Sequence, residues 1–162
     1  MFSDVEARFA ELFREWLQFC IDQREALACY DATVYFSLPD TLRFISLTQA
    51  LEAYHQRFYR PKRDVKFKDR IIDLCNAVRI RVESVVGNID QFATTVTNSR
   101  DYYTHHHSSI RLRGNVATGA KLTIICYHLQ FLFRLGVLTQ FGLDGDRFRV
   151  LARQLPQRIM EY

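Results

Sequence analysis

The sequence has 162 residues, of which 22 are Lys or Arg, 18 are Asp or Glu and 48% are hydrophobic. Only six residues are Gly and three are Pro, so disordered, collagen-like and low-complexity classes are excluded. A chain of this length buries enough surface to fold without disulfides or metal, and we expect a single domain over residues 1–162. The scarcity of turn residues favours long helices over a many-stranded sheet, so the predicted fold class is all-α.

The formal net charge of +4 is compatible with an anionic partner but does not require one. The cysteines lie far apart in the sequence, with no Cys-x-x-Cys pair, at Cys20, Cys29, Cys75 and Cys126. The N-terminus carries no secretory signal pattern. We therefore expect reduced, mostly buried thiols and a cytoplasmic location.

The first predicted helix begins at Ser3, which forms a capping box with Glu6. Its apolar residues recur at helical spacing and are expected to form one buried stripe. The members of this stripe are Val5, Phe9, Leu12, Phe13, Trp16 and Cys20. The helical pattern weakens after Asp22 and resumes over residues 25–36.

Pro39 and Asp40 predict the start of the next helix, because Pro disfavours helical geometry before it and Asp is a good N-cap. This helix is expected to end near Pro61. A third helix is predicted from about residue 66 to Gly87, because glycine is typical of a helix end. A fourth follows, on the stripe Ile89, Phe92, Ala93 and Val96, which continues onto Arg100 and Tyr103.

Residues 122–138 form the most apolar stretch of the chain. Polar side chains near its middle, at His128, Gln130 and Arg134, make insertion into a bilayer centre costly, so we predict a central core helix and no membrane span. We expect His128 and Arg134 to be bonded within the core or an interface. A last short amphipathic helix is predicted over residues 144–155.

The densest group of chemically active side chains lies in residues 97–107. It contains one guanidinium, one carboxylate, two phenols and three imidazoles: Arg100, Asp101, Tyr102, Tyr103, His105, His106 and His107. An arginine fork matches phosphate oxygens and a histidine titrates near neutral pH, which together supply what RNA cleavage needs without a metal. Residues five apart on a straight helix are rotated by about 140°. Either the helix breaks after Tyr103, or each site joins Arg100 and His105 from two chains.

Other interpretations of these residues stay open. Arg100 on an apolar stripe is compatible with an ion pair to a buried carboxylate, and histidines at a helix end complement its dipole. A zinc site on the three histidines has unfavourable geometry, since consecutive helical side chains point about 100° apart. Glu52 and His55 have the spacing of half a di-iron site, but no second copy exists. An ion pair of Glu52 with a basic neighbour is therefore favoured.

A basic run extends over residues 57–70 and is punctuated by aromatic residues. Its members are Arg57, Arg60, Lys62, Arg63, Lys66, Lys68 and Arg70, with Phe58, Tyr59 and Phe67 between them. Such a run suits a phosphate backbone with rings for stacking. A solvated linker flank is the commoner explanation, and both interpretations are kept.

These features resemble the HEPN (higher eukaryotes and prokaryotes nucleotide-binding) superfamily, and within it the C-terminal domain of ApeA-like abortive-infection proteins. The superfamily motif is Arg, then four to six residues of which the first is polar, then His, at the end of a long helix. Residues 100–105 match it. Thr104 precedes the His, as in the ApeA-like branch, and Asp101 stands where Asn is usual.

The resemblance extends beyond this motif. Residues 46–53, residues 67–70 and the apolar segment from Lys121 are also similar, so it covers about residues 30–155. Members of this branch usually carry a large N-terminal region, and a regulatory domain or partner outside this chain is accordingly expected.

The resemblance implies an all-α, HEPN-type bundle of about five to six helices that forms a homodimer with a composite active site. It implies a metal-independent endoribonuclease without cofactors, acting in antiviral defence or toxin-like growth arrest. Arg100 is expected to hold the phosphate, His105 to transfer a proton, and Asp101 to orient either group. Further contacts to RNA are expected from Tyr102, Tyr103, His106, Lys62, Arg63 and Lys66.

Two other functions compete with this one. The first is a non-catalytic HEPN module that binds RNA, a nucleotide or a protein partner. The second is a purely structural dimerisation bundle in which Arg100 lies in an ion pair.

Overall fold

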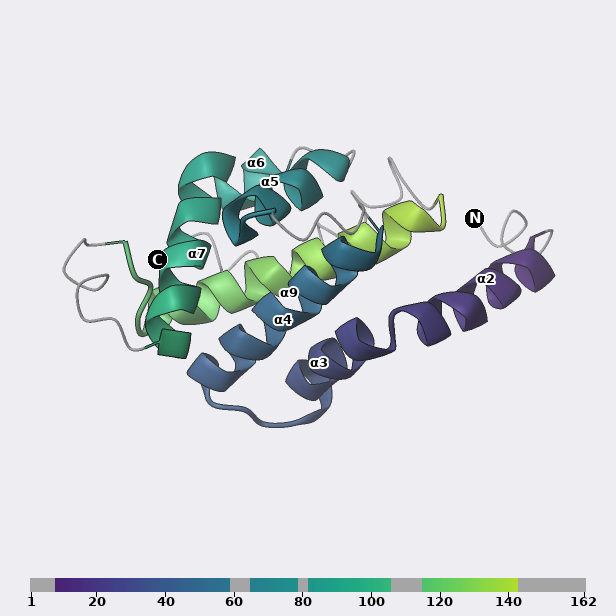
Figure 1. Cartoon of the computed structure of the whole chain (residues 1–162), viewed down its shortest axis with the longest axis horizontal. Helices are drawn as coiled ribbons and strands as arrows, with labels where there is room; N and C mark the ends of the chain where they lie inside the picture. Colours follow the sequence, from purple (N-terminus) through teal and green to yellow (C-terminus); the bar gives the residue numbers. More distant parts are fainter. Residues whose placement is uncertain (1–7, 59–64, 79–81, 106–114, 143–162) are drawn as a thin grey trace.

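The computed structural model describes residues 8–58, 65–78, 82–105 and 115–142, and these residues form helices without any strand. Figure 1 shows the arrangement. The helices of the described residues are α2 (Phe9–Asp22), α3 (Arg24–Tyr35), α4 (Asp40–Phe58), α5 (Phe67–Ala77), α6 (Glu83–Val86), α7 (Ile89–His105) and α9 (Ala120–Gln140). The all-α prediction is confirmed.

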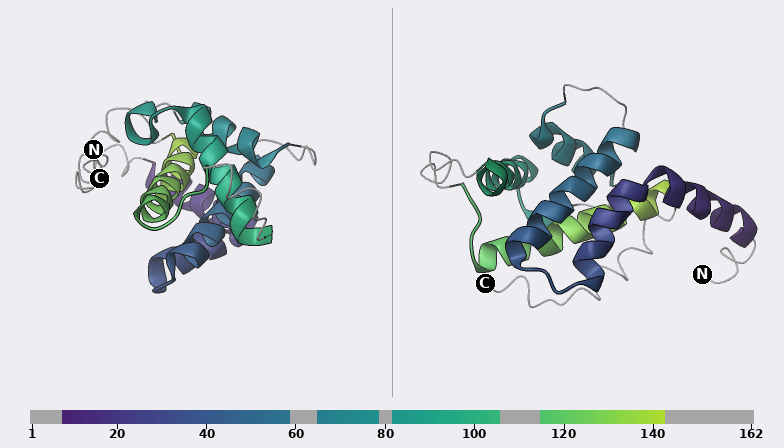
Figure 2. Two further views of the ribbon diagram at one scale, coloured as in Figure 1. Left: turned by 90° about the vertical axis from the view of Figure 1, so that its left-hand side faces the viewer. Right: turned by 60° about the horizontal axis from the view of Figure 1, so that its bottom comes forward.

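The core is built around α4 and α9, which pack side by side (Figures 1 and 2). Helix α3 covers another side of α4, while α5 and α7 pack against each other and both contact α4. Buried side chains from all these helices form one hydrophobic cluster, which includes Phe44, Leu51, Ile71, Val96 and Leu129. This arrangement brings the C-terminal half of α7 next to α4 and the start of α5.

Gly136 allows the close approach of α9 to α4. A Cβ atom placed at this glycine lies 3.0 Å from Cε1 of Tyr54, which is tighter than ordinary van der Waals contact. The Tyr54 ring is 1% exposed and packs on Phe133 and Phe58. The absence of a side chain at residue 136 therefore makes room for the largest buried ring of α4.

Helix α9 is the central helix, as predicted. By length and composition alone, Ala120–Gln140 passes for a membrane-spanning helix, but 56% of its most apolar window is buried inside the protein. Its buried residues include Leu122, Ile125, Leu129 and Leu132. Packing on protein, which core helices of soluble proteins share, accounts for this hydropathy.

The predicted buried stripe of the first helix is wrong in its main members. Phe9, Phe13 and Trp16 are 61%, 50% and 42% exposed, and Phe19 is the buried residue of α2. Helix α2 extends past the other helices (Figure 1), and the direction of the chain changes at Gln23 before α3 begins. Helical spacing identifies residues that share a face, but it does not identify what covers that face. The Ser3 capping box lies outside the described residues.

The predicted third helix is divided in the structure. Helix α5 ends at Ala77, because Val78 adopts an extended conformation with φ −79° and ψ 116°. The short α6 follows and ends at Gly87, where φ is 73°. Val78 and Val82 are both buried, so apolar spacing across the break imitates one continuous helix. The helix predicted over residues 144–155 lies outside the described residues.

Candidate functional site

Arg100 lies on the face of α7 that meets α4 and α5. Its Nη2 atom is 2.7 Å from Oε2 of Glu52 on α4. The guanidinium carbon lies 4.6 Å from the centroid of the Phe67 ring, at the start of α5, within the range of a cation–π contact. The Arg100 and Glu52 side chains are 26% and 32% exposed. Arg100 is thus held from two sides while part of it stays accessible.

Helix α7 continues to His105. Of the two alternatives that the sequence left open, the helix break after Tyr103 therefore does not occur. The Oγ1 atom of Thr104 donates a hydrogen bond of 2.7 Å to the Arg100 carbonyl, inside an intact turn. Helical geometry rotates His105 by about 140° from Arg100 and moves it about 7.5 Å along the axis. His105 is exposed. Within one chain the two residues therefore point in different directions.

Two side chains of α7 anchor the chain that leads into α9. The Tyr103 hydroxyl donates to the Ala117 carbonyl at 2.8 Å, and the Ala117 amide donates to Oγ of the buried Ser99 at 2.9 Å. The Tyr103 ring also meets Phe44 edge-on. These contacts give Tyr103 a packing role in the protomer, so of the two tyrosines expected to contact RNA, Tyr102 is the better suited.

Asp101 and Tyr102 are both partly exposed beside Arg100. The Asp101 Oδ1 atom lies 3.9 Å from Nη1 of Arg100, which is too long for a direct hydrogen bond but close enough for electrostatic attraction. This position is compatible with the orienting role expected of Asp101. That role stays a prediction.

The basic run does not form one free surface in its described part. Arg57 pairs with Glu25 at 3.0 Å, and Lys68 pairs with Asp90 at 2.7 Å. Arg70 is 4% exposed, so neither interpretation of the run, a phosphate contact or a solvated linker flank, fits this residue. Lys66 is exposed directly before Phe67. Of the remaining predicted RNA contacts, Lys62, Arg63 and His106 lie outside the described residues.

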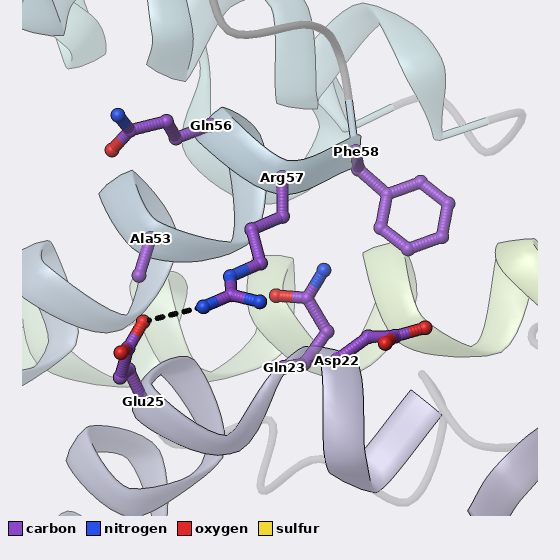
Figure 3. A pocket seen from close by; sticks show the side chains of 7 residues that line it. All are labelled: Asp22, Gln23, Glu25, Ala53, Gln56, Arg57 and Phe58. Carbon is purple, nitrogen blue, oxygen red and sulfur yellow. Dashed lines mark hydrogen bonds and ion pairs between the residues drawn. The ribbon is translucent and has the colours of Figure 1, made fainter. Parts of the chain in front are cut away.

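Arg57 also borders a cavity of about 650 Å³ between the junction of α2 with α3 and the end of α4 (Figure 3). Its ion pair with Glu25 crosses this cavity. Residues from the Arg100 to His105 segment do not line it; the lining residues are Asp22, Gln23, Glu25, Ala53, Gln56, Arg57 and Phe58.

A polar cluster that sequence reasoning did not find lies one turn from Glu52; its His55 and Arg70 are buried, and its Asp73 is exposed. His55 is 2% exposed, and its Nε2 atom is 3.0 Å from Oδ2 of Asp73. Its Nδ1 atom is 3.3 Å from Nη1 of Arg70. The sequence indicated only that Glu52 and His55 lie on one face of the helix, because residues three apart share a face. The partners prove to be Arg100 for Glu52 and Arg70 with Asp73 for His55.

No cluster of three or more His, Cys, Asp or Glu side chains suited to a metal ion occurs among the described residues. All four cysteines are free thiols; Cys75 and Cys126 are buried, and Cys20 and Cys29 are partly buried. Burial raises the pKa of Cys75 and of Cys126 to about 12. Thiolate chemistry at these two positions is disfavoured at neutral pH.

The described residues form an all-α bundle, and HEPN domains are helical. The sequence matches the Apea-like HEPN family over residues 45–147, which is more than half of the 162 residues. The chain belongs to this family. HEPN domains are generally nuclease-like and commonly dimerise, so membership indicates an RNase or a nucleotide-related role. Neither the comparison with curated proteins nor the comparison with solved structures returned a match.

Proposed function

We propose that this protein is a metal-independent endoribonuclease that acts as a homodimer in the cytoplasm, in anti-phage defence or toxin-like growth arrest. The observation that carries the proposal is the support of Arg100. Glu52 and Phe67 hold its guanidinium at a partly exposed position, on the same helix that ends in the exposed His105. A fixed cation near a titratable imidazole is the minimum set of groups for cleaving RNA without metal.

The ribose 2′-hydroxyl is the nucleophile in the proposed reaction. Its oxygen bonds to the adjacent phosphorus while the bond from phosphorus to the leaving 5′-oxygen breaks, giving a 2′,3′-cyclic phosphate and a 5′-hydroxyl. His105 transfers a proton to or from these oxygens. Arg100 neutralises charge that develops on the phosphate oxygens; because Glu52 engages only Nη2, other donors of the guanidinium fork serve the phosphate.

The directions of the two side chains support the proposed homodimer. The intact helix separates Arg100 and His105 by about 140° around its axis, so one protomer does not aim both groups at one phosphate. A twofold axis that brings the ends of two α7 helices together supplies Arg100 from one protomer and His105 from the other. The resulting groove between the two motifs is the proposed RNA site.

Substitution of the two residues tests the catalytic proposal. Arg100→Ala and His105→Ala are each expected to abolish cleavage of labelled RNA while helicity and dimerisation stay intact. Arg57→Ala serves as a control and should retain activity, since Arg57 lies in a separate ion pair with Glu25. Cleavage should persist in chelator and vanish on substrates that lack the 2′-hydroxyl. Loss of wild-type cleavage in chelator would overturn the metal-independent mechanism.

The second candidate is a non-catalytic HEPN module that binds RNA, a nucleotide or a protein partner. The ion pair between Arg100 and Glu52 is compatible with this module. It also fits the purely structural dimerisation bundle, because partner-stabilised arginines serve structural roles. Under the binding-module alternative, purified protein binds its ligand without forming cyclic-phosphate ends. Arg100→Ala would then mainly lower thermal stability.

A further inference from the structure

His55 sits in a buried contact between α4 and α5. The His55 ring is 2% exposed and Arg70 is 4% exposed. One ring nitrogen meets Asp73 at 3.0 Å and the other meets Arg70 at 3.3 Å, both partners being on α5. His55 therefore fixes α5 against α4 through two polar contacts rather than through shape alone.

The chemistry of these partners defines the protonation of the imidazole. A guanidinium only donates hydrogen bonds, so Nδ1 of His55 must accept from Arg70. The proton of the neutral ring then resides on Nε2 and is donated to the Asp73 carboxylate. A second proton on Nδ1 would face the Arg70 donor, so this contact requires the neutral ring.

The contact continues from Arg70 to the start of α5. Nε of Arg70 donates to the Val65 carbonyl at 3.2 Å, which holds the chain just ahead of Phe67. The Phe67 ring lies against the Arg100 guanidinium, 4.6 Å from its carbon. Glu52, the other support of Arg100, lies one turn before His55 on α4. Both supports of Arg100 are thus adjacent to the contact that His55 makes.

We propose that His55 is a positioning residue for Arg100, acting through Arg70 on the Phe67 ring against which the guanidinium lies. In this role it acts through its contact with Arg70. The functional part of the inference rests on the proposed function of Arg100. The structural part concerns the position of the guanidinium and stands independently of RNA cleavage.

Two substitutions of His55 separate this role from general packing. In His55→Asn the amide oxygen occupies the δ position and still accepts from Arg70. In His55→Gln the amide nitrogen occupies the ε position and donates to Asp73, while the acceptor facing Arg70 is lost. Positioning through Arg70 predicts that the Asn variant resembles wild type more closely than the Gln variant does.

The experiment is ¹H–¹⁵N NMR of arginine Nε–H groups in the full chain, with the Arg100 signal assigned from the Arg100→Lys spectrum. We expect the Arg100 signal to shift in His55→Gln and to stay close to its wild-type position in His55→Asn. An unmoved Arg100 signal in His55→Gln would overturn the inference, as would equal shifts in both variants. If His55→Gln fails to fold, Arg70→Met replaces it. A thioether donates no hydrogen bond to His55 or to the Val65 carbonyl, so an unmoved Arg100 signal again overturns the inference.

Kinetics provide the second readout. A displaced Arg100 is expected to lower kcat of RNA cleavage on the order of tenfold to hundredfold in His55→Gln, with a smaller effect on KM and a smaller loss in His55→Asn. An unchanged kcat in a folded His55→Gln protein would overturn the link to activity. Absence of cleavage by the wild-type protein would contradict the proposed function instead, and the NMR comparison would still decide the position of Arg100.

Discussion

At the scale of single residues, the environment of Arg100 is the most informative feature of the molecule. A partly buried guanidinium loses hydration, and Glu52 and Phe67 compensate with an ion pair and a cation–π contact. Both partners also reduce the number of positions that the long side chain samples. Such restraint suits a group that must meet a phosphate in one orientation.

Removing the charge of Glu52 tests how much the restraint of the Arg100 side chain contributes to RNA cleavage. Glu52→Gln is expected to lower kcat of RNA cleavage by roughly tenfold, because Arg100 becomes less fixed. The free energy of unfolding should change by no more than about 1 kcal/mol, since both side chains remain partly exposed and solvent screens the pair. Steady-state cleavage and chemical denaturation measure the two effects. Glu25→Gln, which breaks the pair with Arg57, is the control and should leave kcat unchanged.

The stability of the protein should depend on pH through its buried histidines. Burial lowers the pKa of His55 below its ordinary value of 6.5, with the nearby Arg70 acting in the same direction and Asp73 opposing it. Burial also lowers the pKa of His128. The unfolded chain binds these protons at higher pH than the folded chain does, so stability is complete above pH 6.5 and decreases as the pH falls below it.

Thermal unfolding between about pH 8 and about pH 5 measures this dependence. The melting temperature of the wild-type protein should fall on the acid side, and the slope should be smaller in His55→Asn, which has no ionisable group at this position. An identical slope in the variant would show that His55 does not contribute.

At the scale of helices, the sequence predicts helix boundaries best where a Pro or a Gly marks them. Helix α4 begins at Asp40, directly after Pro39, and Gly87 ends the short α6. The predicted stripe of the first helix failed because Phe9 and Phe13 share a face that no described residue covers fully. Tertiary contacts decide burial, and spacing within one helix carries no information about them.

The contact between α4 and α9 yields a prediction at this scale. Gly136→Ala gains about 1 kcal/mol of helix propensity, but the added methyl group presses on the buried Tyr54 ring at 3.0 Å. Overpacking of this kind costs about 1–3 kcal/mol, so we expect a net loss of stability of about 1 kcal/mol. Denaturant unfolding measures it. A stabilised Gly136→Ala protein would show that the two helices adjust their separation freely.

The site itself was predicted in part. The sequence shows the order of Arg100, Asp101 and His105 along one helix. It also indicated that Glu52 forms an ion pair with a basic neighbour, which the structure identifies as Arg100. The contribution of Phe67 and of the cluster formed by His55 with Arg70 could not be read from the sequence. These contacts depend on how α5 lies against α4, which local sequence patterns do not encode.

At the scale of the whole molecule, the fold and the family agree. The match to the Apea-like HEPN family begins within α4 and includes α5, α6, α7 and α9. These helices contain Arg100, both of its supports and the anchoring contacts of Ser99 and Tyr103. The matched region therefore contains the whole described candidate site, while α2 and α3 precede it.

The central claim is that two chains assemble one RNA-cleaving site from Arg100 and His105. Mixing the inactive Arg100→Ala and His105→Ala proteins under conditions that exchange subunits tests it most directly. A twofold dimer contains two equivalent composite sites, and a mixed dimer keeps one of them intact. Random pairing makes about half of the dimers mixed, so labelled RNA should be cleaved at about a quarter of the wild-type rate. Mixed dimers that form but cleave no more RNA than either variant alone would contradict the account.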